Sequence, residues 1–253
     1  MEEYYLEFIK QEDFEQHVLN TIKQYSETLK SINLKKFNSN IIDPIKLLFD
    51  KSVFNKTFEE IINYEIQRQR DKTNNNTIGY FHQNIFKYIK GCKVPNKGWD
   101  VIVKKGNTTL CIEMKNKHNT MNSSSMKHTY IKMQNAILQN YNDDFNCALV
   151  EIISKKSTND KWVINIKDNI KTSNYRLKKM SIDKFYEYVT DDKLAFKKLC
   201  MQLPITINKI LDKYMPKLLE EDTVFQELAL IDKNIFKSLF KLAFPTYEGF
   251  DDF

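Results

Sequence analysis

Apolar and polar residues alternate on both sides of Gly106-Asn107, a dipeptide typical of a two-residue hairpin turn. With these two residues as the turn, Asp100 on the first strand faces Glu113 on the second. Lys115 shares the face of Glu113 because side chains alternate across a strand. The opposite face consists of apolar residues: Trp99, Val101, Val103, Leu110, Ile112 and Met114. The pattern therefore predicts a hairpin over residues 98–115 with one core-facing side and one side carrying two carboxylates and a lysine, and a one-residue slip would destroy both.

Helical spacing of apolar residues predicts helices in several other stretches. These are residues 1–31, 44–54, 57–72, 79–89 and 126–141, followed by a largely helical segment from Ser181 to about residue 243. A loop is predicted over residues 32–43. A helix break is predicted at Asp71–Thr77, which contains three consecutive asparagines.

Three further segments have the composition of strands. Phe145–Ser154 is mostly apolar, which predicts a central strand buried on both faces. Lys161–Lys167 alternates and predicts a half-exposed strand, and Tyr175–Met180 predicts an added edge strand. The helix at 126–141 would join the strand of Glu113 to the 145–154 strand in a parallel, right-handed crossover.

The order of these elements predicts an α/β fold, with a mixed four- to five-stranded sheet flanked by helices and extra helices at both ends. The length of 253 residues, with 42% hydrophobic and 13% aromatic residues, is enough for one large domain with a sizeable core. We therefore expect a single domain over residues 1–253. It would have an N-terminal helical region (1–56), a core that carries the hairpin (57–190) and a C-terminal helical region (191–253).

The net charge of +6 and a pI near 8.9 favour a polyanionic partner. The same lysine-rich, glycine-poor composition would also follow from an AT-rich gene. Charge alone leaves both explanations open.

The cysteines and the hydrophobic segments bear on the compartment. Cys92, Cys111, Cys147 and Cys200 show no C-x-x-C spacing, which argues against a zinc or iron–sulfur site and fits a reducing environment. The acidic start is followed by no apolar secretory segment. No stretch approaches the ~18 apolar residues that a membrane span needs. We expect a soluble, cytoplasmic protein with no membrane partner.

The polar face of the hairpin suits a hard divalent cation. Facing carboxylates repel each other unless a cation neutralises them. Mg²⁺ prefers oxygen ligands and takes one or two carboxylates, so Asp100, Glu113 and the main-chain carbonyl of Met114 are the candidate metal ligands. Lys115 would orient or help deprotonate an attacking water and offset charge on a phosphate. The alternative is a solvated hairpin face with ordinary lysine–glutamate pairs.

Glu65 is a further candidate catalytic residue, because it lies at the edge of an apolar helix stripe. A buried carboxylate is costly without a partner. Glu65 would support the metal site from a neighbouring helix, or it would pair with Lys72 or a core lysine.

Two groups of residues are candidates for contacts with DNA. Amides, hydroxyls and cations of the loop after the second strand suit a phosphate backbone. They are Asn116, Lys117, His118, Asn119, Asn122, Ser123 and Ser124. Arginine reads guanine by two parallel hydrogen bonds, and the chain's three arginines are Arg68, Arg70 and Arg176. For the loop the alternative is a plain polar linker, and for the arginines a solvated helix end or surface.

Several segments share their residues with one known group of enzymes. They are Glu65–Gln69, Asp71–Asn74, Ile78–Asn84, Trp99–Val101, Glu113–Asn122 and Ser181–Tyr186. In these residues the chain resembles type II restriction endonucleases that recognise GGNCC. The resemblance covers roughly residues 60–200, and the run after Glu113 is long and specific.

The resemblance implies a member of the PD-(D/E)xK nuclease superfamily, with its restriction-endonuclease-like core. By motif position, Asp100, Glu113 and Lys115 take the catalytic places. Trp99 stands where the superfamily pattern has a proline. The resemblance further implies Mg²⁺-dependent cleavage of double-stranded DNA by water, which leaves a 5′-phosphate and a 3′-hydroxyl. It also implies a homodimer in which each protomer reads one half of a palindromic site.

Two other functions compete with a restriction endonuclease. The first is a structure-specific DNA repair or recombination nuclease, which would not cut a plasmid into discrete bands. The second is a basic, helical DNA-binding protein without catalysis, for which Glu113→Ala would change nothing.

Overall fold

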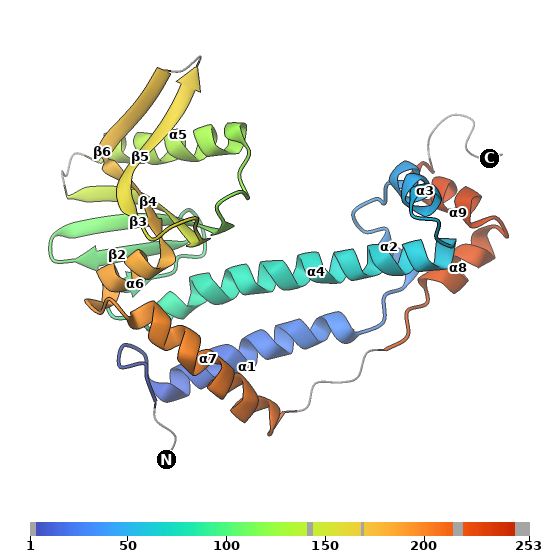
Figure 1. Ribbon diagram of the computed structural model, residues 1–253, viewed down its shortest axis with the longest axis horizontal. Coiled ribbons are helices and arrows are strands. Elements are labelled where there is room, and N and C mark those ends of the chain that lie inside the picture. The colour runs from blue at the N-terminus through green and yellow to red at the C-terminus, as the bar shows by residue number, and fades with distance from the viewer. Residues whose placement is uncertain (1–3, 141–143, 168–169, 215–219, 246–253) are drawn as a thin grey trace. The chain divides into compact units, whose positions relative to one another are not determined.

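The computed structural model describes residues 4–140, 144–167, 170–214 and 220–245. Within these ranges one mixed sheet has six strands in the order β1-β2-β3-β4-β6-β5 (Figure 1). The strands are β1 Cys92–Lys93, β2 Val101–Lys105, β3 Thr108–Lys117, β4 Phe145–Ile153, β5 Asn159–Lys167 and β6 Ile170–Ser181. The predicted mixed sheet with flanking helices is confirmed, but the predicted number of four to five strands was wrong.

The hairpin of β2 and β3 has the predicted register. The strands pair antiparallel, from Lys105 opposite Thr108 at the turn to Val101 opposite Ile112. Gly106 has a φ of 59°, the left-handed conformation that such a turn requires and that glycine adopts without strain. The predicted apolar face is buried at Val101, Val103, Leu110 and Ile112.

The remaining strands extend the sheet on the other side of β3. Helix α5 (Ser123–Gln139) connects β3 to β4, and these strands are parallel, as predicted. β6 is parallel to β4 and antiparallel to β5, so β5 forms the edge and the predicted edge position of residues 175–180 was wrong. Within β6, Lys179 pairs at 2.7 Å with buried Glu151 of β4.

Helices pack on the sheet through apolar side chains. Tyr130, Met133 and Ile137 of α5 lie in a core cluster with residues of β3, β4, β5 and β6. A separate aromatic cluster joins the short helix η2 (Ile85–Tyr88) to α6 (Ile182–Thr190). The ring centroids of Phe86 and Phe185 lie 4.7 Å apart in that cluster.

The other helices differ from prediction at three places. They are α1 Gln11–Ser26, η1 Glu27–Leu29, α2 Leu34–Phe37, α3 Pro44–Val53, α4 Phe58–Asn84, α7 Ala195–Leu211, α8 Val224–Ile231 and α9 Ile235–Ala243. α1 is shorter than the predicted helix over residues 1–31. α2 lies within the predicted loop over residues 32–43, so that prediction was wrong there; the side chain of Asn33 caps this short helix by accepting from the N–H of Lys36. α4 continues through Asp71–Thr77, so the predicted break was wrong. The polar side chains there bond within the helix: Asn75 donates to Asp71, and Thr77 donates to the carbonyl of Thr73.

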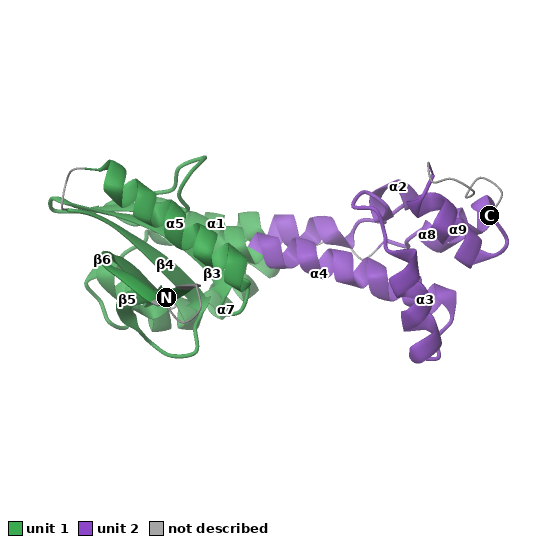
Figure 2. Ribbon diagram, turned by 90° about the horizontal axis from the view of Figure 1, so that it is seen from above, with its two compact units in different colours: residues 1–21, 78–215 green, residues 22–77, 216–253 purple. Residues whose placement is uncertain are grey.

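The chain divides into two compact units (Figure 2). Unit 1 comprises Met1–Thr21 and Ile78–Met215, and it contains the sheet. Unit 2 comprises Ile22–Thr77 and Pro216–Phe253, and its core includes Ile61 and Ile62 of α4 with Leu228 of α8. These units cut across the three regions named from the sequence. No described helix combines the length and the apolar character of a membrane span.

Candidate active site

Asp100 precedes β2 and is fixed by the opposite strand. Its main-chain N–H donates to the carbonyl of Ile112 at 3.0 Å, and its Oδ2 accepts from the main-chain N–H of Met114 at 2.7 Å. Burial raises the pKa of the Asp100 carboxyl, and the nearby charge of Glu113 raises it further, against the hydrogen bond from Met114. The hairpin therefore holds a half-buried carboxylate beside that of Glu113, as its register requires.

Glu113 has the opposite electrostatic surroundings. Burial raises its pKa, but hydrogen bonds from Lys115 and Lys132 overcome this effect and leave the pKa below its usual value. Lys115 Nζ lies 2.8 Å from Oε1, and Lys132 Nζ lies 2.9 Å from Oε2. The three predicted residues Asp100, Glu113 and Lys115 therefore lie together on one face of the hairpin.

Lys132 is a residue of this site that the sequence reasoning missed. It comes from α5, and its Nζ also donates to the carbonyl of Gly98 at 2.9 Å. It lies 4.7 Å from the centre of the Trp99 ring, within the range of a cation–π contact. The signal in the sequence was weak: a lysine between Tyr130 and Met133, both fully buried against the sheet. Lys132 thus links α5 to the carboxylates and to the segment that leads into Asp100.

The donor set fits a hard divalent cation. Two carboxylates from adjacent chain segments share one face, and the two lysine ammonium groups on Glu113 offset their negative charge. Among the described residues, no group of three or more His, Cys, Asp or Glu is placed to hold a metal ion. A cation at Asp100 and Glu113 would therefore need a main-chain carbonyl, water or phosphate to complete its oxygen ligands.

The polar loop after β3 leads into α5 beside this site. A hollow of about 500 Å³ is lined by residues of β3, the loop and α5: Lys115, Thr120, Met121, Ser124, Ser125, His128 and Thr129. Of the predicted contact residues, Ser124 lines this hollow. Asn122 caps α5, because its side chain accepts from the N–H of Ser125 at 2.8 Å. The N–H of His118 donates to the carbonyl of Ile153 in β4.

The other predicted residues of the loop lie close to these in sequence. Asn116 and Lys117 end β3, Asn119 stands in the turn that follows, and Ser123 opens α5. Lys117 and Asn119 are exposed, whereas Asn116 is half-buried. Their contact with DNA stays a prediction.

Glu65 belongs to unit 2 and has a different partner from the one expected. It pairs with Arg68 rather than with Lys72 or a core lysine, at 2.5 Å between Oε1 and Nη2. Arg70 is 6% exposed and holds Asp222 by two hydrogen bonds of 2.8 and 2.9 Å. To read a base, Arg70 would first have to leave Asp222. Arg176 lies on β6, where its guanidinium stands 5.8 Å from the ring centre of Tyr175.

Comparison with known proteins places the chain among restriction enzymes. The sequence model of the Eco47II restriction endonuclease family matches residues 6–212. The type II restriction enzyme Sau96I of Staphylococcus aureus is 34% identical over 211 residues, which is 81% of this chain and 80% of that protein. The type II restriction enzyme Eco47II of Escherichia coli is 29% identical over 245 residues, 94% of this chain and 98% of that protein.

Proposed function

The chain belongs to the Eco47II restriction endonuclease family and is a type II restriction enzyme, and we propose that it cuts double-stranded DNA at the palindromic site GGNCC. As such an enzyme it is a site-specific deoxyribonuclease. The choice of GGNCC is supported by the segments that resemble GGNCC-specific endonucleases, above all Glu113–Asn122.

One observation carries the proposal for the chemistry: Asp100 and Glu113 lie together at the β2–β3 hairpin with two lysine ammonium groups on Glu113. This is the arrangement expected of a PD-(D/E)xK nuclease, with Asp100, Glu113 and Lys115 in the catalytic places. The six-stranded mixed sheet with helices around it supports membership of that superfamily.

We assign the binding of Mg²⁺ to Asp100, Glu113 and the main-chain carbonyl of Met114. When bound, the cation polarises the scissile phosphate and lowers the pKa of a coordinated water. Lys115, whose ammonium lies 2.8 Å from Glu113, would position an attacking water and stabilise the negative charge that develops on the phosphate. The products would be a 5′-phosphate and a 3′-hydroxyl.

Contacts with the DNA are assigned to the surfaces around these residues. The loop after β3 and the start of α5 would hold the phosphate backbone beside the scissile bond. The residues are Asn116, Lys117, His118, Asn119, Asn122, Ser123 and Ser124, with Arg68 and Arg176 as candidate base readers, since Arg70 is engaged with Asp222. A homodimer would place one active site on each strand of a palindrome.

The first test is digestion of a plasmid of known sequence by the purified protein with Mg²⁺, followed by mapping of the ends. Discrete fragments that end within GGNCC are expected. Cleavage only at branched or damaged DNA would instead favour a repair or recombination nuclease, and a different sequence at the ends would overturn the proposed site.

Variants of the site test the assigned roles. Asp100→Ala, Glu113→Ala and Lys115→Ala should each reduce the single-turnover rate ~10²–10³-fold or more, while Lys104→Ala on the exposed part of the hairpin serves as a matched control. Lys132→Met should reduce the rate about tenfold, since it removes one charge-assisted hydrogen bond from Glu113. Binding in Ca²⁺ should persist in all of them. Full activity in any one variant would remove that residue from the site.

A further inference from the structure

The pair of Glu65 and Arg68 in unit 2 is built in a way that points to readout of a base. Glu65 is 7% exposed, and its carboxylate accepts from Arg68 Nε at 2.6 Å, from Arg68 Nη2 at 2.5 Å and from Gln69 Nε2 at 3.1 Å. Gln69 Nε2 also donates to the carbonyl of Phe37 at 3.0 Å. The Glu65 carboxylate is therefore held in one orientation. It binds the guanidinium of Arg68 along the edge formed by Nε and Nη2.

The two partners differ strongly in exposure. The Arg68 side chain is 57% exposed, whereas that of Glu65 is 8% exposed. A guanidinium carries five N–H donors in a rigid fork. With Nε and Nη2 bound to Glu65, the end formed by Nη1 and Nη2 keeps two parallel donors for a further partner. Guanine presents the matching acceptors, O6 and N7, in the major groove.

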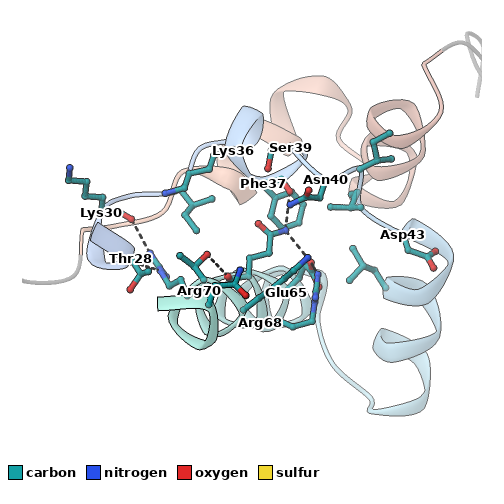
Figure 3. Close-up of a pocket in the computed structure, with 18 of the residues that line it drawn as sticks. Thr28, Lys30, Lys36, Phe37, Ser39, Asn40, Asp43, Glu65, Arg68 and Arg70 are labelled. Carbon is teal, nitrogen blue, oxygen red and sulfur yellow. Dashed lines mark hydrogen bonds and ion pairs between the residues drawn. The ribbon is translucent and has the colours of Figure 1, made fainter. Parts of the chain in front are cut away.

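Arg68 lines a cavity of about 710 Å³ whose lining carries four lysines and two arginines against three acids, Glu27, Asp43 and Glu65. Figure 3 shows Glu65 and Arg68 on α4, with Lys36, Ser39 and Asn40 of α2 and the loop after it across the cavity. Lys36 and Lys72 on its rim are exposed. A cavity of this chemistry suits a polyanion, with amides and hydroxyls for base edges and lysines for phosphates.

The loop after α2, which lines this cavity, contains a strained residue. Ile41 lines the cavity, is 68% exposed and has a φ of 47°. A β-branched residue rarely adopts this conformation, and such strain is concentrated at ligand sites because the surrounding structure must hold it. The strain at Ile41 is thus a feature of this cavity that is independent of the ion pair.

Arg70 stands two residues away and serves as an internal contrast. Its guanidinium is engaged with Asp222 and donates to the carbonyls of Thr28 at 2.7 Å and Lys30 at 3.3 Å. It therefore ties α4 to the segments around it inside unit 2. Arg70 therefore stabilises the fold of unit 2, whereas Arg68 is held by buried Glu65 and is exposed to solvent.

We propose that Arg68 reads a guanine of the recognition site from this cavity and that Glu65 is the residue that positions it. This inference rests on the proposed function, since it presupposes a sequence-specific DNA partner. It gives Glu65 a role in specificity in place of a role at the metal.

The decisive variant is Arg68→Lys, which keeps the charge but loses the planar fork. Binding is measured in Ca²⁺ with short duplexes that carry GGNCC, with each single-base change of that site, and with 7-deazaguanine, which lacks the N7 acceptor, at each guanine in turn. For the wild type, one guanine position should show a loss of about 5- to 150-fold on substitution. In Arg68→Lys this loss should shrink toward unity at that position alone, while binding to unrelated DNA stays unchanged.

Glu65→Gln tests the positioning role, because it keeps the size of the side chain and removes its charge. It should weaken discrimination at the same guanine, and Lys72→Ala should weaken binding to all duplexes equally. Circular dichroism checks that each variant is folded. If Glu65→Gln fails to fold, Arg68→Lys alone decides whether Arg68 reads the base.

Two outcomes would overturn the inference. In the first, Arg68→Lys retains discrimination at every position; in the second, it weakens all duplexes uniformly, which marks a phosphate contact. Unchanged discrimination in a folded Glu65→Gln would remove the positioning role. Failure of the proposed function looks different, because the wild type itself would then show no preference for GGNCC.

Discussion

At the scale of residues, similar side chains have different properties because their surroundings differ. Asp100 loses hydration and faces another carboxylate, so its pKa rises, whereas Glu113 is equally enclosed but is bonded to two lysines, so its pKa falls. The same contrast separates Arg68 from Arg70, one with an open end and the other 6% exposed. The residue types made these positions candidates in the sequence, and their contacts in the structure distinguish their proposed roles.

We expect His82 to make the stability of the protein depend on pH. Burial lowers the pKa of its imidazole from 6.5 to about 4, with a smaller effect from His17. Its Nδ1 is buried and accepts or donates no hydrogen bond within the described residues. Because the unfolded chain binds the proton more readily, the contribution of His82 is complete above about pH 6.5 and is lost as the pH falls toward 4.

This loss is measured by urea unfolding between pH 7.5 and 4.5, where it should amount to about 2–3 kcal/mol. His82→Gln, which cannot be protonated, should make the curve less steep over this interval, while the lowered pKa of buried His17 should leave a residual slope. His128→Gln, on the exposed side of the hollow next to α5, serves as the control and should leave the curve as in the wild type. An unchanged slope in His82→Gln would show that other groups cause the pH dependence.

At the scale of elements, local sequence patterns predicted the pairing of strands well and the continuity of helices less well. The turn at Gly106-Asn107 and the alternation around it determined the register of β2 and β3, and hence the site of Asp100, Glu113 and Lys115. The parallel crossover through α5 followed from the length of the connection. Residues close together in the sequence specify both the hairpin register and the crossover, so both could be predicted.

Features that depend on distant partners were missed. Asp71–Thr77 was expected to break a helix because of low helix propensity, yet side-chain bonds one turn apart keep α4 continuous. β1 has two residues, too few for any periodic pattern, and forms because Cys92 and Lys93 pair with β2. Lys132 was missed for the same reason: its importance comes from Glu113 on another element.

Gly91 should be essential for the attachment of β1 to β2. It has a φ of 81°, and a Cβ atom there would lie 2.9 Å from the carbonyl oxygen of Lys104, a main-chain atom that cannot move cheaply. The N–H of Lys104 also donates to the carbonyl of Gly91 at 2.8 Å. Gly91→Ala should therefore lower the free energy of unfolding by about 2 kcal/mol or more.

Gly79 provides a matched comparison for this substitution. It lies inside α4, and a Cβ atom there would meet no atom within 4 Å. Gly79→Ala should raise the free energy of unfolding by roughly 0.5–1 kcal/mol, because alanine loses less freedom in a helix. Urea unfolding of both variants tests the pair, and equal effects of the two substitutions would contradict the contact seen at Gly91.

At the scale of the whole molecule, the proposed chemistry divides between two compact units. Asp100, Glu113 and Lys115 belong to unit 1, whereas Glu65 and Arg68 belong to unit 2. Each unit has its own buried core. Cleavage and base discrimination should therefore be separable. Substitutions of Asp100, Glu113 or Lys115 should remove cleavage and keep specific binding. Substitutions of Arg68 should reduce base discrimination and keep the cleavage chemistry.

A double-strand cut also bears on the number of chains. The proposed site of one chain of 30.2 kDa holds a single pair of hairpin carboxylates, which suits cleavage of one strand. A palindrome then calls for two protomers related by two-fold symmetry. Light scattering of the protein on a GGNCC duplex in Ca²⁺ should give the mass of two chains and one duplex.

Mixed dimers make this expectation decisive. Wild-type and Glu113→Ala chains with different affinity tags are expressed together, and the mixed dimer is purified through both tags. The mixed dimer should convert supercoiled plasmid to the nicked circle at about half the wild-type rate of strand cleavage, because one of its two protomers is inactive. It should form linear plasmid only slowly. Lys104→Ala in place of Glu113→Ala provides the control, which should yield linear plasmid as the wild type does. Rapid linearisation by the Glu113→Ala mixture would mean that one protomer cuts both strands in turn, and the two-fold arrangement would then have no role in cleavage.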